Sequence, residues 1–146
     1  MKIIETGIFI QASREKVWEA LSDLGKYSEW NPFIPGISGE LKEGARLLVR
    51  IALPGGDPMD FAPIVKVAEP GVELRWLGRL WIPGLLDGEH SFRIEEAGEG
   101  HVHLVQSEIF RGILVPFIPS SLFERTRQGF EEMDRAPKER VESAGS

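Results

Sequence analysis

The stretch LDGEHSFRIEEAGEGHVHLVQSEIFR, residues 86–111, contains two runs of alternating residues separated by Gly98-Glu99-Gly100. Alternation predicts strands and a short glycine-rich break predicts a turn, so we expect an antiparallel hairpin with strands over 86–96 and 102–111. A turn centred on Glu99 places three pairs of residues opposite one another: Ile94 with Leu104, Phe92 with Gln106, and His90 with Glu108. Because opposed residues share a face, the hairpin predicts an apolar interior face that carries a few polar groups.

Other segments of the chain also show the pattern of antiparallel strands. The expected strands cover residues 2–11, 46–53, 61–69 and 72–82. The last two flank Pro70-Gly71, which is typical of a two-residue turn. Pairing across this turn puts Val67 opposite Leu74 and Val65 opposite Trp76.

The final element is expected to be a long helix over residues 120–136. Ser121 and Glu124 have the spacing of a capping box, which begins a helix. Five side chains then follow at helical spacing and form an amphipathic stripe that needs a partner surface: Leu122, Phe123, Thr126, Phe130 and Met133. Pro137 should kink or end the helix near Ala136, because proline lacks the amide hydrogen that a helix interior requires.

Together these elements predict an α+β fold. A curved antiparallel sheet of about six to seven strands wraps around the long C-terminal helix, and two short helices over 13–22 and 27–33 follow the first strand. We expect a single domain over residues 1–141. The remaining residues, 142–146, are small and polar and are expected to form a flexible tail.

The composition of the 146-residue chain excludes several kinds of chemistry. It has no cysteine, which excludes thiolate catalysis, cysteine zinc sites and disulfides. Of its three histidines, His101 and His103 have a spacing that could bind a metal, but the sequence offers no firm third ligand beside them. A formal net charge of -6 argues against nucleic-acid binding. No segment has the length of a signal peptide's apolar region or of a membrane span. We therefore expect a cytoplasmic protein without a metal or other cofactor and without stable membrane insertion.

Several strings resemble motifs of the START/Bet v 1-like superfamily, also called SRPBCC or helix-grip proteins, in its polyketide cyclase/dehydrase-like branch. They are residues 10–23 (IQASREKVWEALSD), 27–33 (YSEWNPF), 84–92 (GLLDGEHSF), 106–112 (QSEIFRG) and 129–133 (GFEEM). The resemblance extends over about residues 3–136. It is specific for the fold and much less so for function, because this superfamily holds carriers, receptors, cyclases and co-chaperones.

The resemblance implies a deep, mostly apolar cavity between the sheet and the last helix. The predicted strand and helix faces supply its candidate ligand-binding residues, which are Phe61, Trp76, His90, Phe92, Gln106, Glu108, Phe110, Phe123, Thr126, Phe130 and Met133, with Leu47, Val49, Ile51, Val65 and Leu74 as further lining. An apolar wall with a few polar groups is what a small-molecule site needs.

The polar members of this face each have two interpretations. His90 and Glu108 are the candidates for acid–base catalysis, because an imidazole beside a carboxylate exchanges protons near neutral pH. The same pair also serves a purely structural role if each group satisfies the other. Gln106 either binds a ligand or ties the sheet to the last helix.

Three hypotheses for function follow. The first is a protein, monomeric or a homodimer, that binds a small hydrophobic molecule such as a lipid, a polyketide-like compound or an aromatic compound. The second is a cyclase/dehydrase-type enzyme in which His90 and Glu108 move a proton. The third is a co-chaperone or toxin-like module that binds other proteins through its outer sheet face or its apolar loops.

Overall fold

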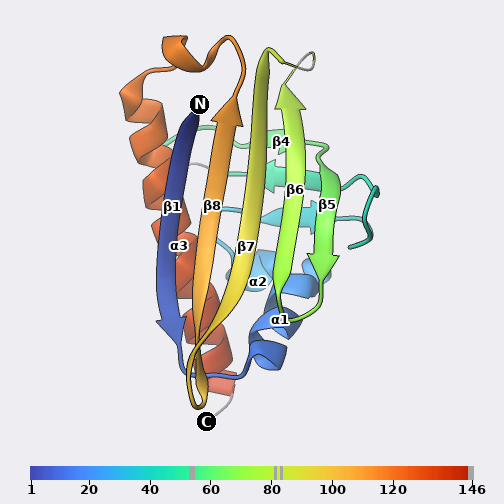
Figure 1. Cartoon of the computed structure of the whole chain (residues 1–146), viewed down its shortest axis with the longest axis vertical. Helices are drawn as coiled ribbons and strands as arrows, with labels where there is room; N and C mark the ends of the chain where they lie inside the picture. Colours follow the sequence, from blue (N-terminus) through green and yellow to red (C-terminus); the bar gives the residue numbers. More distant parts are fainter. Residues whose placement is uncertain (53–54, 81, 83, 145–146) are drawn as a thin grey trace.

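The computed structural model describes residues 1–52, 55–80, 82 and 84–144. A long helix, α3, and a second, smaller sheet lie on the same side of a large antiparallel sheet, and the strands of the small sheet run across those of the large one (Figure 1). The elements in chain order are β1 (Lys2–Ile10), α1 (Arg14–Ser22), η1 (Leu24–Lys26), α2 (Tyr27–Trp30), β2 (Gly36–Ser38), β3 (Leu48–Ile51), β4 (Met59–Phe61), β5 (Ile64–Glu69), β6 (Glu73–Leu80), β7 (Leu86–Gly98), β8 (His101–Arg111), η2 (Val115–Phe117) and α3 (Ser120–Ala144).

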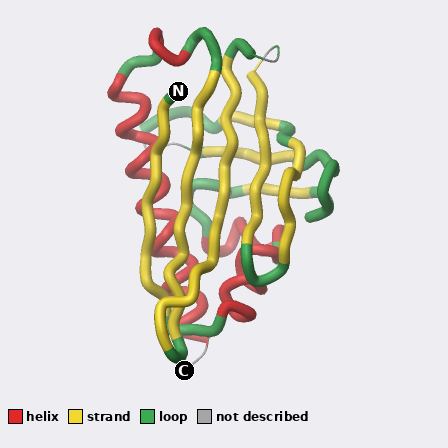
Figure 2. The backbone as a smooth tube through the Cα atoms, in the orientation of Figure 1, coloured by secondary structure: helices red, strands yellow, loops and turns green. Residues whose placement is uncertain are grey.

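The α+β class and the long C-terminal helix are confirmed, and the strands divide into two sheets. The large sheet has the order β1-β8-β7-β6-β5 and the small one the order β2-β3-β4 (Figure 2). Residues 45–47 join the two sheets at the edge of β5, where Val65 N donates to Ala45 O at 2.8 Å and Leu47 N donates to Pro63 O at 2.8 Å. Residues 53 and 81, near the ends of two expected strands, lie outside the described residues.

The hairpin of β7 and β8 has the predicted pairs, although its turn is not centred on Glu99. Gly98 pairs with His101, and a register shift between Glu96 and Gly98 restores the predicted register. The opposed pairs include Ile94 with Leu104, Phe92 with Gln106, and His90 with Glu108. The interior face of this hairpin is buried, from Phe92 at 2% exposure to Leu104 at 0%. The sheet therefore presents the predicted side chains to α3.

The turn between β5 and β6 differs from the prediction. It spans three residues, since Val72 N donates to Glu69 O at 3.0 Å and Glu69 pairs with Glu73. Val67 consequently lies opposite Arg75 and not opposite Leu74. A bulge between Val65 and Val67 shifts the register back, so Val65 still pairs with Trp76 as predicted.

Helix α3 continues through Pro137 to Ala144, so the predicted end near Ala136 is wrong. The lost helical hydrogen bond costs about 3 kcal/mol. Contacts beyond the proline offset that cost: Val141 is buried in the core, Arg140 lies 3.7 Å from Glu29, and the Glu142 carboxylate accepts from Gln11 N at 2.9 Å. Residues 142–144 accordingly belong to the helix and not to a tail, and residues 145–146 lie outside the described part of the chain.

The short segment after α1 positions one wall of the interior. Asn31 ends α2, and its side-chain oxygen accepts from Phe33 N at 3.0 Å and from Ile34 N at 2.8 Å. This side-chain turn replaces the helical hydrogen bonds that Pro32 would interrupt. It directs Phe33 and Ile34, exposed by 3% and 1%, into the interior.

The outer face of the large sheet carries ion pairs. Arg75 contacts Glu73 at 2.6 Å and Glu89 at 3.0 Å. Such partly exposed pairs contribute little to stability and are typical of a solvated face. Among the described residues, no helix combines the length and the hydrophobicity that a membrane crossing requires.

Candidate ligand-binding site

A cavity of about 230 Å³ lies between the upper half of the large sheet, the small sheet and the first turns of α3. Its walls are mostly apolar, and aromatic rings contribute from both sheets and from the helix. The lining residues are Phe33, Ile34, Val49, Ile51, Asp57, Met59, Phe61, Pro63, Trp76, Gly78, Leu86, Gly88, His90, Glu108, Phe110, Ile118, Leu122, Phe123, Thr126 and Phe130.

The cavity has an outer mouth and a closed inner end. Met59 and Leu122 line it and are exposed by 48% and 37%, so they mark the mouth. Further inward the lining includes Trp76 on β6, His90 on β7 and Phe130 on α3, all 5% exposed or less. One step deeper, the core residues fill the space: Leu74 on β6, Phe92 on β7, Gln106 on β8 and Met133 on α3.

The inner end carries the polar pair that the hairpin predicts. His90 Nδ1 lies 2.6 Å from Glu108 Oε2, and the His90 side chain is 4% exposed. A carboxylate only accepts hydrogen bonds, so this contact places the hydrogen on Nδ1. Gly88 makes room for the carboxylate, since a Cβ at this position would lie 2.6 Å from Glu108 Oε1.

Aromatic rings surround the imidazole of His90. Trp76 stacks on it with 5.2 Å between ring centroids and an interplanar angle of 13°. Phe92 and Phe130 meet it edge to face at 4.8 Å and 5.0 Å. These contacts and the hydrogen bond to Glu108 fix the ring in one orientation.

The second nitrogen of this imidazole lacks a protein partner. Within the described residues, His90 Nε2 is buried and forms no hydrogen bond. Nearly all buried polar groups in folded proteins are paired, so an orphan atom in a cavity wall indicates a place for a ligand group or a water molecule. Because Nδ1 carries the hydrogen, Nε2 of the neutral ring is an acceptor.

Gln106 forms the tie between the sheet and the last helix, which is one of the two roles that the sequence left open, and its Oε1 has no partner among the described residues. Its Nε2 donates to Phe130 O at 3.2 Å and to Asp134 Oδ1 at 2.9 Å, which ties β8 to α3 beneath the cavity. Burial raises the pKa of Asp134 to about 6, and the hydrogen bond from Gln106 opposes that rise. No sequence pattern singles out Asp134, because its neighbours Glu131, Glu132 and Arg135 are charged and are typical of a solvent-exposed helix segment.

The structure brings most of the predicted site residues together around the cavity. These are Phe61, Trp76, His90, Glu108, Phe110, Phe123, Thr126 and Phe130, with Val49 and Ile51 as further lining. The others are displaced from the predicted lining into the closed core beside it: Phe92, Gln106, Met133, Leu47, Val65 and Leu74. Alternation predicts which face a residue occupies and not how far along the strand the open space extends.

Sequence reasoning missed part of the lining. Met59 and Pro63 follow a glycine-rich loop with no regular pattern, and Gly78 and Gly88 have no side chain that periodicity could detect. Gly78 and Gly88 lie opposite each other on β6 and β7, where they leave the space that larger residues would fill. In the described ranges, no three histidine, aspartate or glutamate side chains converge as metal ligands.

Comparison with known proteins places this arrangement in a family. The family model described as polyketide cyclase / dehydrase and lipid transport matches residues 1–135. The chain belongs to this family. No curated protein matches the sequence.

Solved structures share its fold at low sequence identity. A START superfamily protein from Mycobacterium smegmatis is 18% identical with a TM-score of 0.77, covering 97% of this chain and 98% of that one. The Zhui aromatase/cyclase from Streptomyces sp. R1128 is 13% identical with a TM-score of 0.78, covering 99% and 96%. A norcoclaurine synthase mutant from Thalictrum flavum is 14% identical with a TM-score of 0.70, covering 99% and 96%. The chain therefore has the START/Bet v 1-like helix-grip fold, which fits ligand binding.

Proposed function

We propose that the protein binds a small amphipathic molecule whose apolar body fills the cavity and whose hydroxyl group donates to His90 Nε2. The orphan Nε2 at the inner end is the observation that carries this proposal. Aromatic walls supply the apolar contacts, at about 25 cal/mol for each Å² of apolar surface removed from water. The hydrogen bond from the hydroxyl group to His90 Nε2 then orients the ligand in the cavity.

The ligand enters with its hydroxyl group first. The polar pair of His90 and Glu108 lies at the inner end, whereas Met59, Leu122 and the exposed Asp57 line the cavity at its mouth. Thr126 adds no free donor, since its hydroxyl donates to Leu122 O at 2.9 Å. The apolar end of the ligand consequently points towards the mouth.

A matched pair of probes tests this proposal. We expect 1-naphthol to bind roughly tenfold more tightly than 1-methylnaphthalene, because the two have similar shape and only the first can donate to Nε2. Isothermal titration calorimetry on the wild type and on His90→Phe measures the difference. The proposal predicts that His90→Phe removes the preference while its melting temperature shows that it is folded. Equal affinities in the wild type, no binding of either probe, or a preference kept in His90→Phe would overturn it.

An enzyme is the second candidate, and the His90–Glu108 contact favours it. In an apolar cavity, Nε2 is placed to take a proton from a carbon beside a ligand carbonyl, and Glu108 is placed to stabilise the imidazolium that results. That is the proton transfer needed for aldol-type ring closure or for loss of water. Protein side chains leave this cavity open, which favours ligand binding or catalysis over the protein-interaction module.

Deuterium exchange separates the enzyme from the binding protein. We incubate 2-tetralone with the protein in heavy water and follow exchange at its α-carbon by NMR. An enzyme accelerates the exchange, and His90→Gln abolishes the acceleration because an amide forms hydrogen bonds and transfers no proton. No acceleration by the wild type, or equal acceleration by His90→Gln, would leave binding as the function.

A further inference from the structure

Exposed apolar side chains lie at the mouth of the cavity and on chain segments next to lining residues. We call them the mouth rim: Met59, Ile82, Ile113, Phe117 and Leu122. Ile113 and Phe117 are exposed by 70% and 80%, which is unusual for such large side chains. The start of β7 and the segment that follows β8 lie at the same end of the molecule (Figure 1).

Backbone contacts hold two parts of this rim in place. Ile113 N donates to Gly84 O at 3.1 Å, and Leu114 N donates to Leu85 O at 3.1 Å. Gly112 makes the close approach possible, since it has a φ of +124° and a Cβ there would lie 2.4 Å from Leu85 O. The exposed side chains therefore project from segments fixed to each other.

The charge at this end differs in sign from the charge of the whole chain. From residue 112 to residue 123 there is no charged side chain. Two exposed arginines, Arg111 and Arg125, stand on either side of this run, and within the described residues neither pairs with a carboxylate. Lys2, at the start of β1, is also exposed. Three carboxylates belong to the same region: Asp57 lines the cavity, Glu124 precedes Arg125, and Asp87 lies opposite Arg111 and 3.9 Å from Arg79. With Lys2, Arg79, Arg111 and Arg125 counted against them, an excess of one positive charge remains in a chain of net charge -6.

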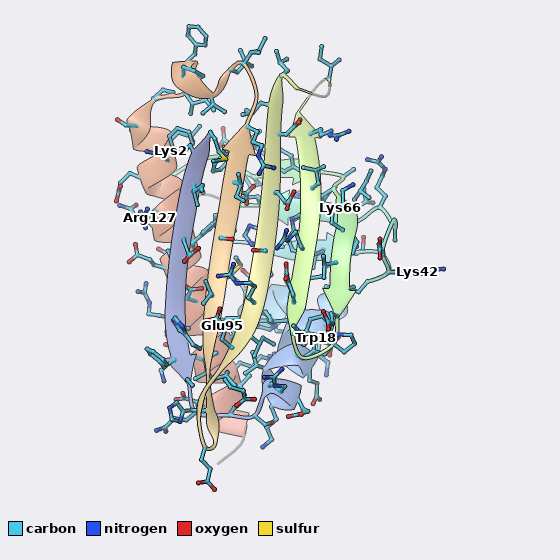
Figure 3. The ribbon with its side chains drawn as sticks, viewed as in Figure 1. Lys2, Trp18, Lys42, Lys66, Glu95 and Arg127 are labelled. Atoms are coloured by element: carbon cyan, nitrogen blue, oxygen red, sulfur yellow. The ribbon has the colours of Figure 1, made fainter. Side chains whose placement is uncertain are left out.

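The basic residues neighbour residues that line the cavity, since Arg111 follows Phe110 and Arg125 precedes Thr126 in the chain. Lys2 pairs with Phe110 across β1 and β8, and its Nζ lies 5.3 Å from the centroid of the Phe123 ring, which lines the cavity. Figure 3 places Lys2 beside the upper part of α3, whereas Glu95 lies towards the opposite end of β7. Apolar side chains framed by basic ones match the acyl chains and the anionic headgroups of a lipid surface.

We propose that the mouth rim docks on an anionic lipid bilayer, with Ile113 and Phe117 among the acyl chains and Lys2, Arg111 and Arg125 at the headgroups. Docking turns the mouth of the cavity towards the bilayer, in which an apolar ligand dissolves. This benefit of docking rests on the proposed ligand-binding function. A second copy of the chain is a poorer occupant, because a symmetric contact through this rim would bring the same basic residues together.

Vesicle sedimentation without any ligand tests the docking. The probes are vesicles of phosphatidylcholine with 30% phosphatidylglycerol and vesicles of phosphatidylcholine alone. We expect the wild type to bind the anionic vesicles and the variant with Ile113→Ser and Phe117→Ser to bind them roughly tenfold more weakly or worse. Arg111→Gln with Arg125→Gln should weaken binding to anionic vesicles and leave binding to neutral ones unchanged.

Phe9→Ser is the matched control. Phe9 is 60% exposed and pairs with His103 near the opposite end of β1, so its loss should leave vesicle binding unchanged. The proposal fails if the wild type does not sediment with anionic vesicles, or if Phe9→Ser weakens binding as much as the double variant. It also fails if analytical ultracentrifugation shows that the wild type is a dimer and that the double variant dissociates it without changing vesicle binding. Naphthol binding is measured in solution, so failure of the proposed function and failure of docking are separate results.

Discussion

The two ends of the interior between the large sheet and α3 are built from the same strands and differ in how full they are. At the lower end Leu74, Phe92 and Met133 fill the space and are 2% exposed or less. At the upper end Gly78 and Gly88 lie opposite each other, and a cavity of about 230 Å³ remains. The difference shows that the absence of side chains at Gly78 and Gly88 leaves the space that forms the site.

The polar groups at the two ends differ in the same way. Below the cavity, the Gln106 amide donates twice and ties two elements together. Two residues along β8, Glu108 holds one nitrogen of His90 and leaves the other without a protein partner among the described residues. Gln106 Oε1 also lacks a partner among the described residues, but Gln106 does not line the cavity, whereas His90 does. The unpartnered acceptor that a ligand in the cavity can reach is therefore His90 Nε2.

The largest expected effect is on stability at the filled end. Phe92→Ala should lower the free energy of unfolding by about 3–5 kcal/mol, because it leaves a hole in a closed core. Phe61→Ala removes a half-buried ring beside space that is already open and should cost roughly 1 kcal/mol. Urea denaturation of both variants measures this contrast, and equal losses would show that the two ends are packed alike.

The pH dependence of stability tests the buried carboxyl at the filled end. Burial raises the pKa of Asp134 from 3.8 to about 6, so folding favours its protonated form. Its contribution is fully present below pH 3.8 and is lost as the pH rises through about 6, by about 2–3 kcal/mol. We expect the stability of the wild type relative to Asp134→Asn to fall by this amount between pH 4 and pH 7 in urea titrations. A constant difference would contradict the burial argument.

Two glycines at the open end provide a matched comparison. In Gly88→Ala the new methyl group would meet Glu108 Oε1 at 2.6 Å and displace the carboxylate that orients His90. We expect it to weaken 1-naphthol binding about tenfold, or by about 1.4 kcal/mol. In Gly78→Ala the nearest atom is Gly88 O at 3.8 Å, an ordinary contact, so affinity should change less than about threefold. If calorimetry gives equal losses, volume and not the carboxylate controls binding.

The smallest effect is expected on the outer face of the same strands. Arg75→Gln removes contacts with Glu73 and Glu89, and it should cost less than about 1 kcal/mol because the pairs are partly exposed. Thermal melts at low and high salt measure the cost. A larger or salt-independent loss would show that the outer face also supports the fold.

The sequence predicts the hairpin of β7 and β8 well because its alternation is long and its turn is marked by glycines. The pairing of His90 with Glu108 matches the register expected for a turn centred on Glu99. The actual turn pairs Gly98 with His101, and a register shift between Glu96 and Gly98, which the sequence does not predict, restores the expected pairs. The turn after Glu69 does not follow from the sequence pattern, because the bulge between Val65 and Val67 depends on how β5 meets residues 45–47. The end of α3 is not predictable locally either, because local propensity at Pro137 opposes the helix and distant contacts of Val141 and Glu142 extend it.

The depth of the site depends on tertiary structure in the same way. Phe92 and Phe110 have the same parity as His90 and Glu108, yet only Phe110 reaches the cavity. Periodicity assigns a face, whereas the two sheets and the position of α3 decide where that face is covered.

The most direct measurement follows the nitrogen atoms of His90. The chain has three histidines, so protein labelled with ¹⁵N at histidine gives three ring systems that His90→Gln assigns. We predict that 1-naphthol shifts the Nε2 signal of His90 in the direction of an accepted hydrogen bond and leaves His101 and His103 unchanged. If calorimetry shows binding of 1-naphthol while the Nε2 signal of His90 does not move, the orphan nitrogen is not the anchor of the ligand.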